Sequence, residues 1–447
     1  MSGCWLCLRC ISKSATQQQH RMDPVANPGE LNQLHLAVFT GSAEHTQAVL
    51  AGGTVDVDQR SADGSTPLMM AAFKGYSHIA KMLIKKGANV SMADKQGFTA
   101  LHFCSAREGD DAIVKLLAKA GADLDAKTPE GDTPLHRATH HGSSKVVRAL
   151  IEAGANPDSQ LRDGATALHI AAEGGHVAVI RELLRGKANP LLIQAHPSRN
   201  TAAVPLDIAA QRGHADVVRE LLQELGIEGC DATSAGAHAL AFAASEQHLD
   251  VMAILTGAGV VDTGKALYLA AGMGHEASVR FLLRHRHKEG GCGVEDAYVN
   301  AREINGYTPL VVCIQGCFSQ APRIVRMLVD AGADTTSPLQ AMNFKGRVIF
   351  NDTPLAFTKS RLRDKIVGDG KPATKEHLHR LEAIRRLLLR VKAVHAVSWL
   401  WPSGAPFTGR ATESDPEPPL PALKLMLPIL KRRTKRRCGL VATLLRW

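Results

Sequence analysis

The residues that come closest to a ligand-binding motif lie in the segment GVVDTGKA, from Gly259 to Ala266. An apolar run, VMAIL, precedes them, so the segment resembles a strand followed by a glycine-rich loop that cradles a phosphate group, with Lys265 as the phosphate-binding lysine. Such loops need a serine or threonine hydroxyl for magnesium directly after the lysine, and Ala266 has none. We favour the repeat structure described below, and nucleotide binding is the enzymatic alternative.

Histidine and cysteine offer further candidates for metal binding or proton transfer, because the chain has 20 histidines. The densest group is HRH at residues 285–287, with Cys292 nearby. We interpret this group as a solvated loop, and a metal site is the alternative. No serine–histidine–aspartate or cysteine–histidine arrangement is recognisable. The sequence therefore predicts no catalytic residue, no metal site and no cofactor.

Three of the nine cysteines, Cys4, Cys7 and Cys10, are regularly spaced near the N-terminus beside apolar residues. Three thiols alone do not complete a tetrahedral zinc site. Reversible S-palmitoylation is chemically reasonable for exposed thiols in such a setting, and a disordered leader without a lipid is the other interpretation. The odd number of cysteines, without a framework spacing, indicates a reducing compartment.

Most of these residues lie at fixed positions of a sequence block that recurs along the chain. A sequence of the form G-x-T-P-L-H-x-A-A returns about every 33 residues, for example GSTPLMMAA from Gly64 and GDTPLHRAT from Gly131. Fainter copies continue as far as GYTPLVVCI from Gly306, and a second phrase such as IAKMLIKKGAN, from Ile79, lies between copies. A fixed period of this length predicts a solenoid of stacked small units.

Each unit carries signals for two helices. Thr-Pro, as at Thr66 and Pro67, suits the start of the first helix, because proline is tolerated in the first turn. The second helix has apolar residues at i, i+3 and i+4, as at Ile79, Met82 and Leu83. Glycine then supplies the left-handed conformation that ends this helix, at Gly87, Gly121, Gly154 and Gly332.

These units closely resemble ankyrin repeats, over about three quarters of the chain. The resemblance implies an all-α solenoid of stacked helix-turn-helix repeats, joined by β-hairpins or loops and followed and preceded by flexible extensions. It also implies that the histidine of the T-P-L-H slot fixes the hairpin and the helix start by hydrogen bonding, at His35, His102, His136 and His169. Cys104 and Cys313 occupy the slot of the first paired alanine, where a small buried residue is expected.

The repeat positions and the composition predict four segments. Residues 1–29 are expected to form a disordered leader that contains the cysteines, and residues 30–350 a solenoid of about nine repeats. Residues 351–394 are expected to form a degenerate last repeat and a capping helix, and residues 395–447 a flexible tail that is rich in proline and then basic. Residues 285–305 read as a surface insertion, and the repeats between residues 201 and 305 vary in length.

Charge separates the tail from the repeats. From residue 395 onwards there are nine lysines and arginines against three acidic residues, out of a net charge of +10 for the chain. The remaining net charge of +4 is spread over residues 1–394, which argues against a repeat body that binds nucleic acid. The run KRRTKRR suggests nuclear import or contact with anionic lipid, and a solvated charge run is the plain alternative; its cations are Lys431, Arg432, Arg433, Lys435, Arg436 and Arg437. No apolar run is long enough for a membrane-spanning helix.

In ankyrin-like stacks, the hairpin tips and the exposed side of the first helices form a concave groove that binds partner proteins. Phe39 and Phe73 occupy equivalent positions in neighbouring repeats, and Phe98 lies on the next hairpin. Because only 4% of the residues are aromatic, this grouping predicts a recognition hot spot. The alternative is that Phe39 covers the N-terminal end of the stack and Phe98 packs on its own hairpin.

Basic residues are expected to continue this groove, and they would favour a partner with apolar anchors and acidic flanks; they are Lys74, Lys95, Arg107, Arg137, His140, His141 and Arg212. A solvated face is the plain alternative. We therefore predict a non-enzymatic, monomeric, intracellular scaffold or adaptor that holds partner proteins, in the cytoplasm or also in the nucleus. The alternatives are a nuclear regulator whose basic tail contacts nucleic acid or the import machinery, and an adaptor tethered peripherally to a membrane through acylated Cys4, Cys7 and Cys10.

Overall fold

The computed structural model describes residues 32–53, 55–106, 111–195, 202–225, 235–285, 298–302, 306–336, 339–342, 348–367 and 371–400. The N-terminal cysteines, Arg107, residues 286–297 of the insertion and the basic tail lie outside these ranges, so the predictions made for them stay predictions. The chain divides into two compact units, Met1–Asp262 and Thr263–Trp447, which are described separately.

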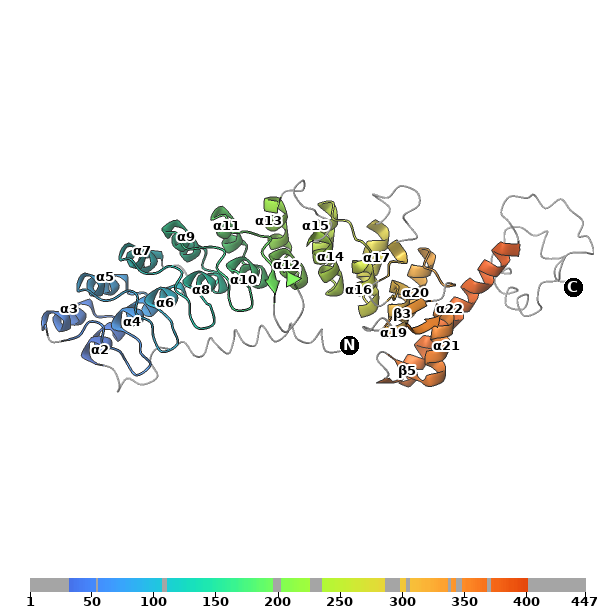
Figure 1. Cartoon of the computed structure of the whole chain (residues 1–447), viewed down its shortest axis with the longest axis horizontal. Coiled ribbons are helices and arrows are strands. Elements are labelled where there is room, and N and C mark those ends of the chain that lie inside the picture. Colours follow the sequence, from blue (N-terminus) through green and yellow to red (C-terminus); the bar gives the residue numbers. More distant parts are fainter. Residues whose placement is uncertain are drawn as a thin grey trace, which may run out of the picture. The chain divides into compact units, whose positions relative to one another are not determined.

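Unit 1, coloured from blue to green in Figure 1, consists of helix pairs. In each pair the inner helix carries the T-P-L-H-like block and the outer helix follows it. The inner helices in the described residues are α2 (Gln33–Phe39), α4 (Pro67–Lys74), α6 (Ala100–Ser105), α8 (Pro134–His140), α10 (Ala167–Gly174), α12 (Pro205–Arg212) and α14 (Ala235–Ser245). The outer helices there are α3 (Ala43–Ala51), α5 (Ser77–Lys85), α7 (Asp111–Lys119), α9 (Ser144–Ala153), α11 (Val177–Arg185), α13 (Ala215–Leu225) and α15 (Leu249–Gly257).

Neighbouring inner helices pack on one another and so do neighbouring outer helices, which gives unit 1 two layers of helices (Figure 1). Paired alanines such as Ala71 and Ala72 are fully buried, and their small size lets the backbones approach closely. Cys104 replaces such an alanine and is buried, as predicted. Two short strands, β1 (Gln194–Ala195) and β2 (Ala202–Ala203), pair antiparallel before α12. The all-α repeat solenoid predicted from the sequence is confirmed.

The helices begin and end where the sequence signals predict. Helix α4 begins at Pro67, and the hydroxyl of Thr66 accepts a hydrogen bond from the backbone N–H of Met69. The glycines predicted after the outer helices have positive φ, for example 90° at Gly87 and 104° at Gly154. Only residues without a Cβ adopt this conformation at little cost, so glycine ends these helices.

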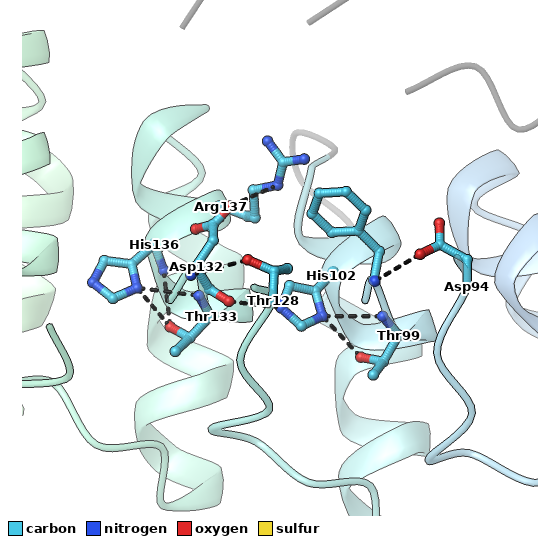
Figure 2. Close-up of polar contacts among 9 residues, drawn as sticks. Asp94, Thr99, His102, Thr128, Asp132, Thr133, His136 and Arg137 are labelled. Carbon is cyan, nitrogen blue, oxygen red and sulfur yellow. Dashed lines mark hydrogen bonds and ion pairs between the residues drawn. The ribbon is translucent and has the colours of Figure 1, made fainter. Parts of the chain in front are cut away.

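The T-P-L-H histidines join consecutive repeats (Figure 2). Nδ1 of His102 accepts the backbone N–H of Thr99 at 3.1 Å and lies 2.9 Å from its hydroxyl, while Nε2 donates to the carbonyl oxygen of Asp132, one repeat further, at 3.1 Å. His136 and His169 repeat this pattern. The role that the ankyrin resemblance implied for these rings is thus confirmed.

Burial lowers the pKa of His102, His136 and His169 to about 4. Their rings are therefore neutral at physiological pH, which suits a pattern in which one ring nitrogen accepts and the other donates. Protonation would remove the acceptor that receives the threonine N–H. These contacts therefore depend on pH.

Unit 2 begins with two helix pairs, α16 (Lys265–Met273) with α17 (Glu276–His285) and α19 (Pro309–Gly316) with α20 (Ala321–Asp330). Lys265 is the first residue of α16, and the apolar run VMAIL before it lies in helix α15 of unit 1. The strand that a phosphate-binding loop requires is therefore a helix, and this contradicts the nucleotide-binding alternative. Cys313 in α19 is fully buried, as expected, and burial raises the pKa of its thiol.

The C-terminal part of unit 2 combines two short hairpins with two helices. Strands β3 (Leu339–Met342) and β4 (Val348–Asp352) pair antiparallel, then α21 (Pro354–Asp364) follows, with Thr353 as its N-cap. Strands β5 (Ile366–Val367) and β6 (Lys371–Pro372) lead to α22 (Lys375–Leu400), which packs on α20 and α21. No helix in the described ranges is long and apolar enough to cross a bilayer.

Acid should destabilise the stack through its buried histidines. Because the folded-state pKa of His136 is about 4, below its ordinary 6.5, its contribution to stability is complete above pH 6.5 and is lost as the pH falls towards 4. We expect His136→Gln to be less stable at pH 7 but to lose about 2 to 3 kcal/mol less than wild type between pH 7 and 4.5, in urea unfolding. His78→Gln, at an exposed ring on α5, is the control; equal pH slopes for all three proteins would refute the assignment.

The ring of His248 should increase the loss of unfolding free energy when Gly213 is replaced by alanine. Gly213 ends α12 with φ of 79°, and a Cβ there would come within 2.6 Å of the His248 ring. Gly87 has a similar φ of 90°, but a Cβ would meet nothing within 4 Å. Gly87→Ala should therefore cost about 1 to 2 kcal/mol of unfolding free energy, and Gly213→Ala about 1 to 3 kcal/mol more. Denaturant titration measures both, and equal costs would show that the ring moves aside freely.

Candidate functional site

The aromatic and basic residues singled out in the first repeats form a continuous row on the inner helices and hairpins of unit 1. We call this row the aromatic–cation cluster; it consists of Phe39, Phe73, Lys74, Phe98, Phe103 and Arg137. Its members come from α2, α4, α6, α8 and the hairpin before α6. Each contacts the next, so the repeats supply one surface together.

Lys74 links the first two rings of the cluster. Its Nζ lies 4.7 Å from the ring centroid of Phe39 and 5.9 Å from that of Phe73, within the range of cation–π attraction. The Phe73 ring then meets Phe103 edge to face, with centroids 6.2 Å apart and planes at 89°. This T-shaped geometry is the arrangement that ring quadrupoles favour.

The second half of the cluster ends in an ion pair (Figure 2). The rings of Phe103 and Phe98 have centroids 6.0 Å apart, and the guanidinium of Arg137 lies 4.7 Å from the Phe98 centroid. Nε of Arg137 is 3.1 Å from a carboxylate oxygen of Asp132. The carboxylate and the ring together hold the guanidinium in place.

The repeat register explains how these side chains meet. Phe103 and Arg137 follow the T-P-L-H histidine in consecutive repeats, whereas Phe98 and Asp132 precede the threonine in consecutive hairpins. Phe103 and Arg137 therefore occupy equivalent positions one repeat apart, and so do Phe98 and Asp132. As a result, the hairpin residue Phe98 contacts the inner-helix residue of its own repeat and that of the next one.

Arg137 is largely buried, with 9% of its surface exposed, although the sequence suggested an exposed position in the groove. Desolvation raises the pKa of Asp132 to about 6 and the positive charge of Arg137 opposes that shift, while burial lowers the pKa of Arg137. The pair adds no net charge when Asp132 is ionised. Arg137 therefore supports the aromatic rings more than it offers a charge to a partner.

The remaining basic residues also change the expected charge of this face. Arg212 is 2.5 Å from a carboxylate oxygen of Glu173. The rings of His140 and His141 lie 5.4 Å apart, and burial and the neighbouring positive charges lower the pKa of His141 to about 4. The cationic bias that the sequence suggested for this groove is thus reduced, because two arginines are paired with carboxylates and His141 is neutral at pH 7.

Lys95 is exposed on its hairpin and has no contact with the cluster among the described residues, and Arg107 lies outside them. Two cluster contacts escaped the sequence reasoning, Phe103 and the carboxylate of Asp132. Phe103 was visible as an aromatic residue next to a T-P-L-H histidine in a chain with few aromatics. Leu36, in the same slot of α2, is 43% exposed and extends the apolar surface beside Phe39.

The side chains of the cluster suit binding and offer no reactive group. In the ranges that the structure describes, no group of three or more histidine, cysteine, aspartate or glutamate residues is arranged to hold a metal ion. The ring of His285, from the HRH group, stacks on Phe281 with centroids 4.0 Å apart. Arg286, His287 and Cys292 lie outside the described ranges.

The ion pair of the cluster should respond to pH in the opposite sense to the histidines. The raised pKa of Asp132 means that its contribution to stability is greatest below about pH 4 and falls as the pH rises through 6. Relative to Asp132→Asn, wild type should therefore lose on the order of 1 to 2 kcal/mol of unfolding free energy between pH 4.5 and 7. Glu152→Gln, at an exposed site on α9, is the control. A difference that stays constant with pH would contradict the raised pKa.

Comparison with known proteins places unit 1 in one family. A family model of three consecutive ankyrin repeats matches residues 34–128 and again 103–194, and a model of the single ankyrin repeat matches residues 203–233. These segments contain the helix pairs from α2/α3 to α12/α13.

Relatives of this chain share short stretches of such repeats. A probable palmitoyltransferase, AKR2, of Saccharomyces uvarum is 36% identical over 85 residues, which are 18% of this chain and 12% of the relative. An E3 ubiquitin-protein ligase, KEG, of Arabidopsis thaliana is 42% identical over 74 residues, 16% of this chain and 5% of the ligase. The poly(ADP-ribose) polymerase tankyrase of Caenorhabditis elegans is 46% identical over 66 residues, 14% of this chain and 3% of the polymerase.

The matched stretches are thus a small part of these relatives, and the enzymes among them resemble this chain in the repeat region alone. The residues that the comparisons match are those that form the repeat unit in the structure, with its T-P-L-H block, its paired helices and the glycines that end them. Residues 34–194 and 203–233 of this chain are therefore ankyrin repeats.

Proposed function

We propose that this chain is a non-enzymatic scaffold or adaptor that binds a partner protein on the aromatic–cation cluster. Ankyrin repeats serve protein–protein interaction, and the relatives with enzyme names share only such repeats with this chain. The observation that carries the proposal is the continuous contact from Phe39 through Phe103 to Arg137 across four consecutive repeats.

The cluster has the properties of a binding hot spot. Phe39, Phe73 and Phe98 are half-buried, so each presents part of its ring to solvent while its neighbours hold it. Phe103 is 3% exposed and serves as the buried support between two of them. Rings that are fixed before binding lose little conformational entropy when a partner arrives, which favours affinity.

The chemistry of the partner follows from the charges that remain available. Lys74 forms no ion pair with a carboxylate in the described part of the chain, and its ammonium lies between two rings. Arg137 already has a carboxylate at 3.1 Å. We therefore infer a partner segment with apolar or aromatic anchors and one carboxylate near Lys74, which is a weaker acidic requirement than the sequence suggested.

The test immobilises the full chain and quantifies the cell proteins that it retains by mass spectrometry. Phe39→Ala/Phe73→Ala should remove the specific partner, because losing two hot-spot rings costs about 2 to 4 kcal/mol, or roughly 30-fold or more in affinity. Lys74→Glu should weaken binding of the same partner through repulsion of its carboxylate.

The matched control is Leu191→Ala/Ile193→Ala, which removes apolar side chains that are 54% and 53% exposed but lie outside the cluster. This variant should retain the partner at the wild-type level, and circular dichroism should show the same helix content for all the proteins. A partner that survives the double phenylalanine change, or that is lost equally in the control, would place the binding site elsewhere.

A further inference from the structure

Positive charge is concentrated near the C-terminal end of unit 2. Residues 354–392 contain eleven lysines and arginines against four acidic residues, a net charge of +7. Since the tail from residue 395 carries +6 of the total +10, the rest of the chain is negative by 3. The near-neutral average for the repeat body therefore conceals a strongly basic pair of helices, α21 and α22.

Helix α22 separates its apolar and basic residues. Leu381, Ile384 and Leu388 are almost completely buried, and α22 packs on α20 and α21. At 100° per residue, Arg386 and Arg390 project from the side opposite these leucine and isoleucine side chains. His379 and Lys375 share that side, about two and three turns before Arg386. All four are exposed.

We call Lys375, Arg386 and Arg390 the cationic stripe. Its ends are about 22 Å apart along the helix axis, at 1.5 Å per residue. Arg386 shares Glu382 with Arg385, which leaves an excess of positive charge, and neither Lys375 nor Arg390 has a carboxylate partner in the described ranges. Helix α22 lies beside α21 (Figure 1). Lys359 on α21 is also exposed.

We propose that the cationic stripe binds the sugar-phosphate backbone of a double-helical nucleic acid. Each strand of a duplex carries one phosphate per about 3.4 Å of helix axis, so a straight row of cations about 22 Å long can face several phosphates at once. The guanidinium groups of the two arginines match phosphate oxygens in a bidentate geometry. Binding of this kind is electrostatic, independent of base sequence and strongly dependent on salt.

Two features favour a duplex over other polyanions. Residues 375–392, which carry the stripe, contain no phenylalanine, tyrosine or tryptophan, so the stripe itself has no ring on which single-stranded bases could stack. Leu381, Ile384 and Leu388 are buried within unit 2, so the apolar side of α22 around them is not free to insert into a bilayer as an interfacial amphipathic helix would. The proposal is independent of partner binding by the aromatic–cation cluster.

The test must separate the stripe from the basic tail. We would replace Lys431, Arg432, Arg433, Lys435, Arg436 and Arg437 with glutamine in the full chain, and measure binding of a labelled DNA duplex and a matched RNA duplex by fluorescence anisotropy at several salt concentrations. Lys375→Gln/Arg386→Gln/Arg390→Gln in this background should weaken binding at least about tenfold at low salt. It should also reduce the slope of log K against log salt by about 2 to 3, since each phosphate contact contributes about 0.9.

The control is Lys81→Gln/Lys85→Gln/Lys119→Gln, which removes the same charge from exposed positions on α5 and α7 and should leave binding within about twofold of the background. Circular dichroism and thermal unfolding check that each variant is folded. Vesicles of phosphatidylcholine with and without phosphatidylserine form a separate arm. The proposal is overturned if the tail-neutralised chain binds no duplex, if both triple variants bind equally, or if the stripe is needed for anionic vesicles alone.

Discussion

The hydrogen bonds of the T-P-L-H histidines are the constraint on which the rest of unit 1 depends. The rings of His102, His136 and His169 each accept from the threonine of their own hairpin and donate to a backbone carbonyl of the next repeat. A histidine ring can accept at Nδ1 and donate from Nε2 only when it is neutral. The stack therefore requires these histidines to be buried and uncharged. The same bonds set the register between repeats, and this register places every surface side chain relative to its neighbours.

The aromatic–cation cluster is a direct consequence of that register. His102 donates to the backbone carbonyl of Asp132 in the next repeat, and the side chain of Asp132 pairs with Arg137 of that same repeat. Arg137 can then occupy the slot that Phe103 fills one repeat earlier, because a carboxylate and an aromatic face stabilise its charge there. The residue that receives the buried histidine bond thus also supports a feature of the surface.

The two units offer surfaces of different kinds. In unit 1 the charges near the rings are largely compensated, so the partner that we propose would be recognised there by shape and by aromatic contact. In unit 2 the apolar side of α22 is used to complete the helical packing, which leaves an uncompensated basic side. The two ligands that we propose, a protein partner for the first surface and a polyanion for the second, follow from one physical reason. Each would contact the groups that folding leaves exposed, which are aromatic rings in unit 1 and cations in unit 2.

The sequence by itself determined the repeat period, the helix pairs, the capping threonines, the glycine ends and the slots of the buried histidines. These are local patterns, and hydrogen bonds and backbone preferences within a few residues decide them. It also pointed to Phe39, Phe73 and Phe98, because aromatic residues are rare in the chain. Only the tertiary structure placed Lys74 between two rings, added Phe103 as their support and buried Arg137 against Asp132. The contacts of Lys74 with Phe39 and of Phe73 with Phe103 join residues about one repeat apart, and their geometry depends on how the repeats pack, which no local pattern specifies.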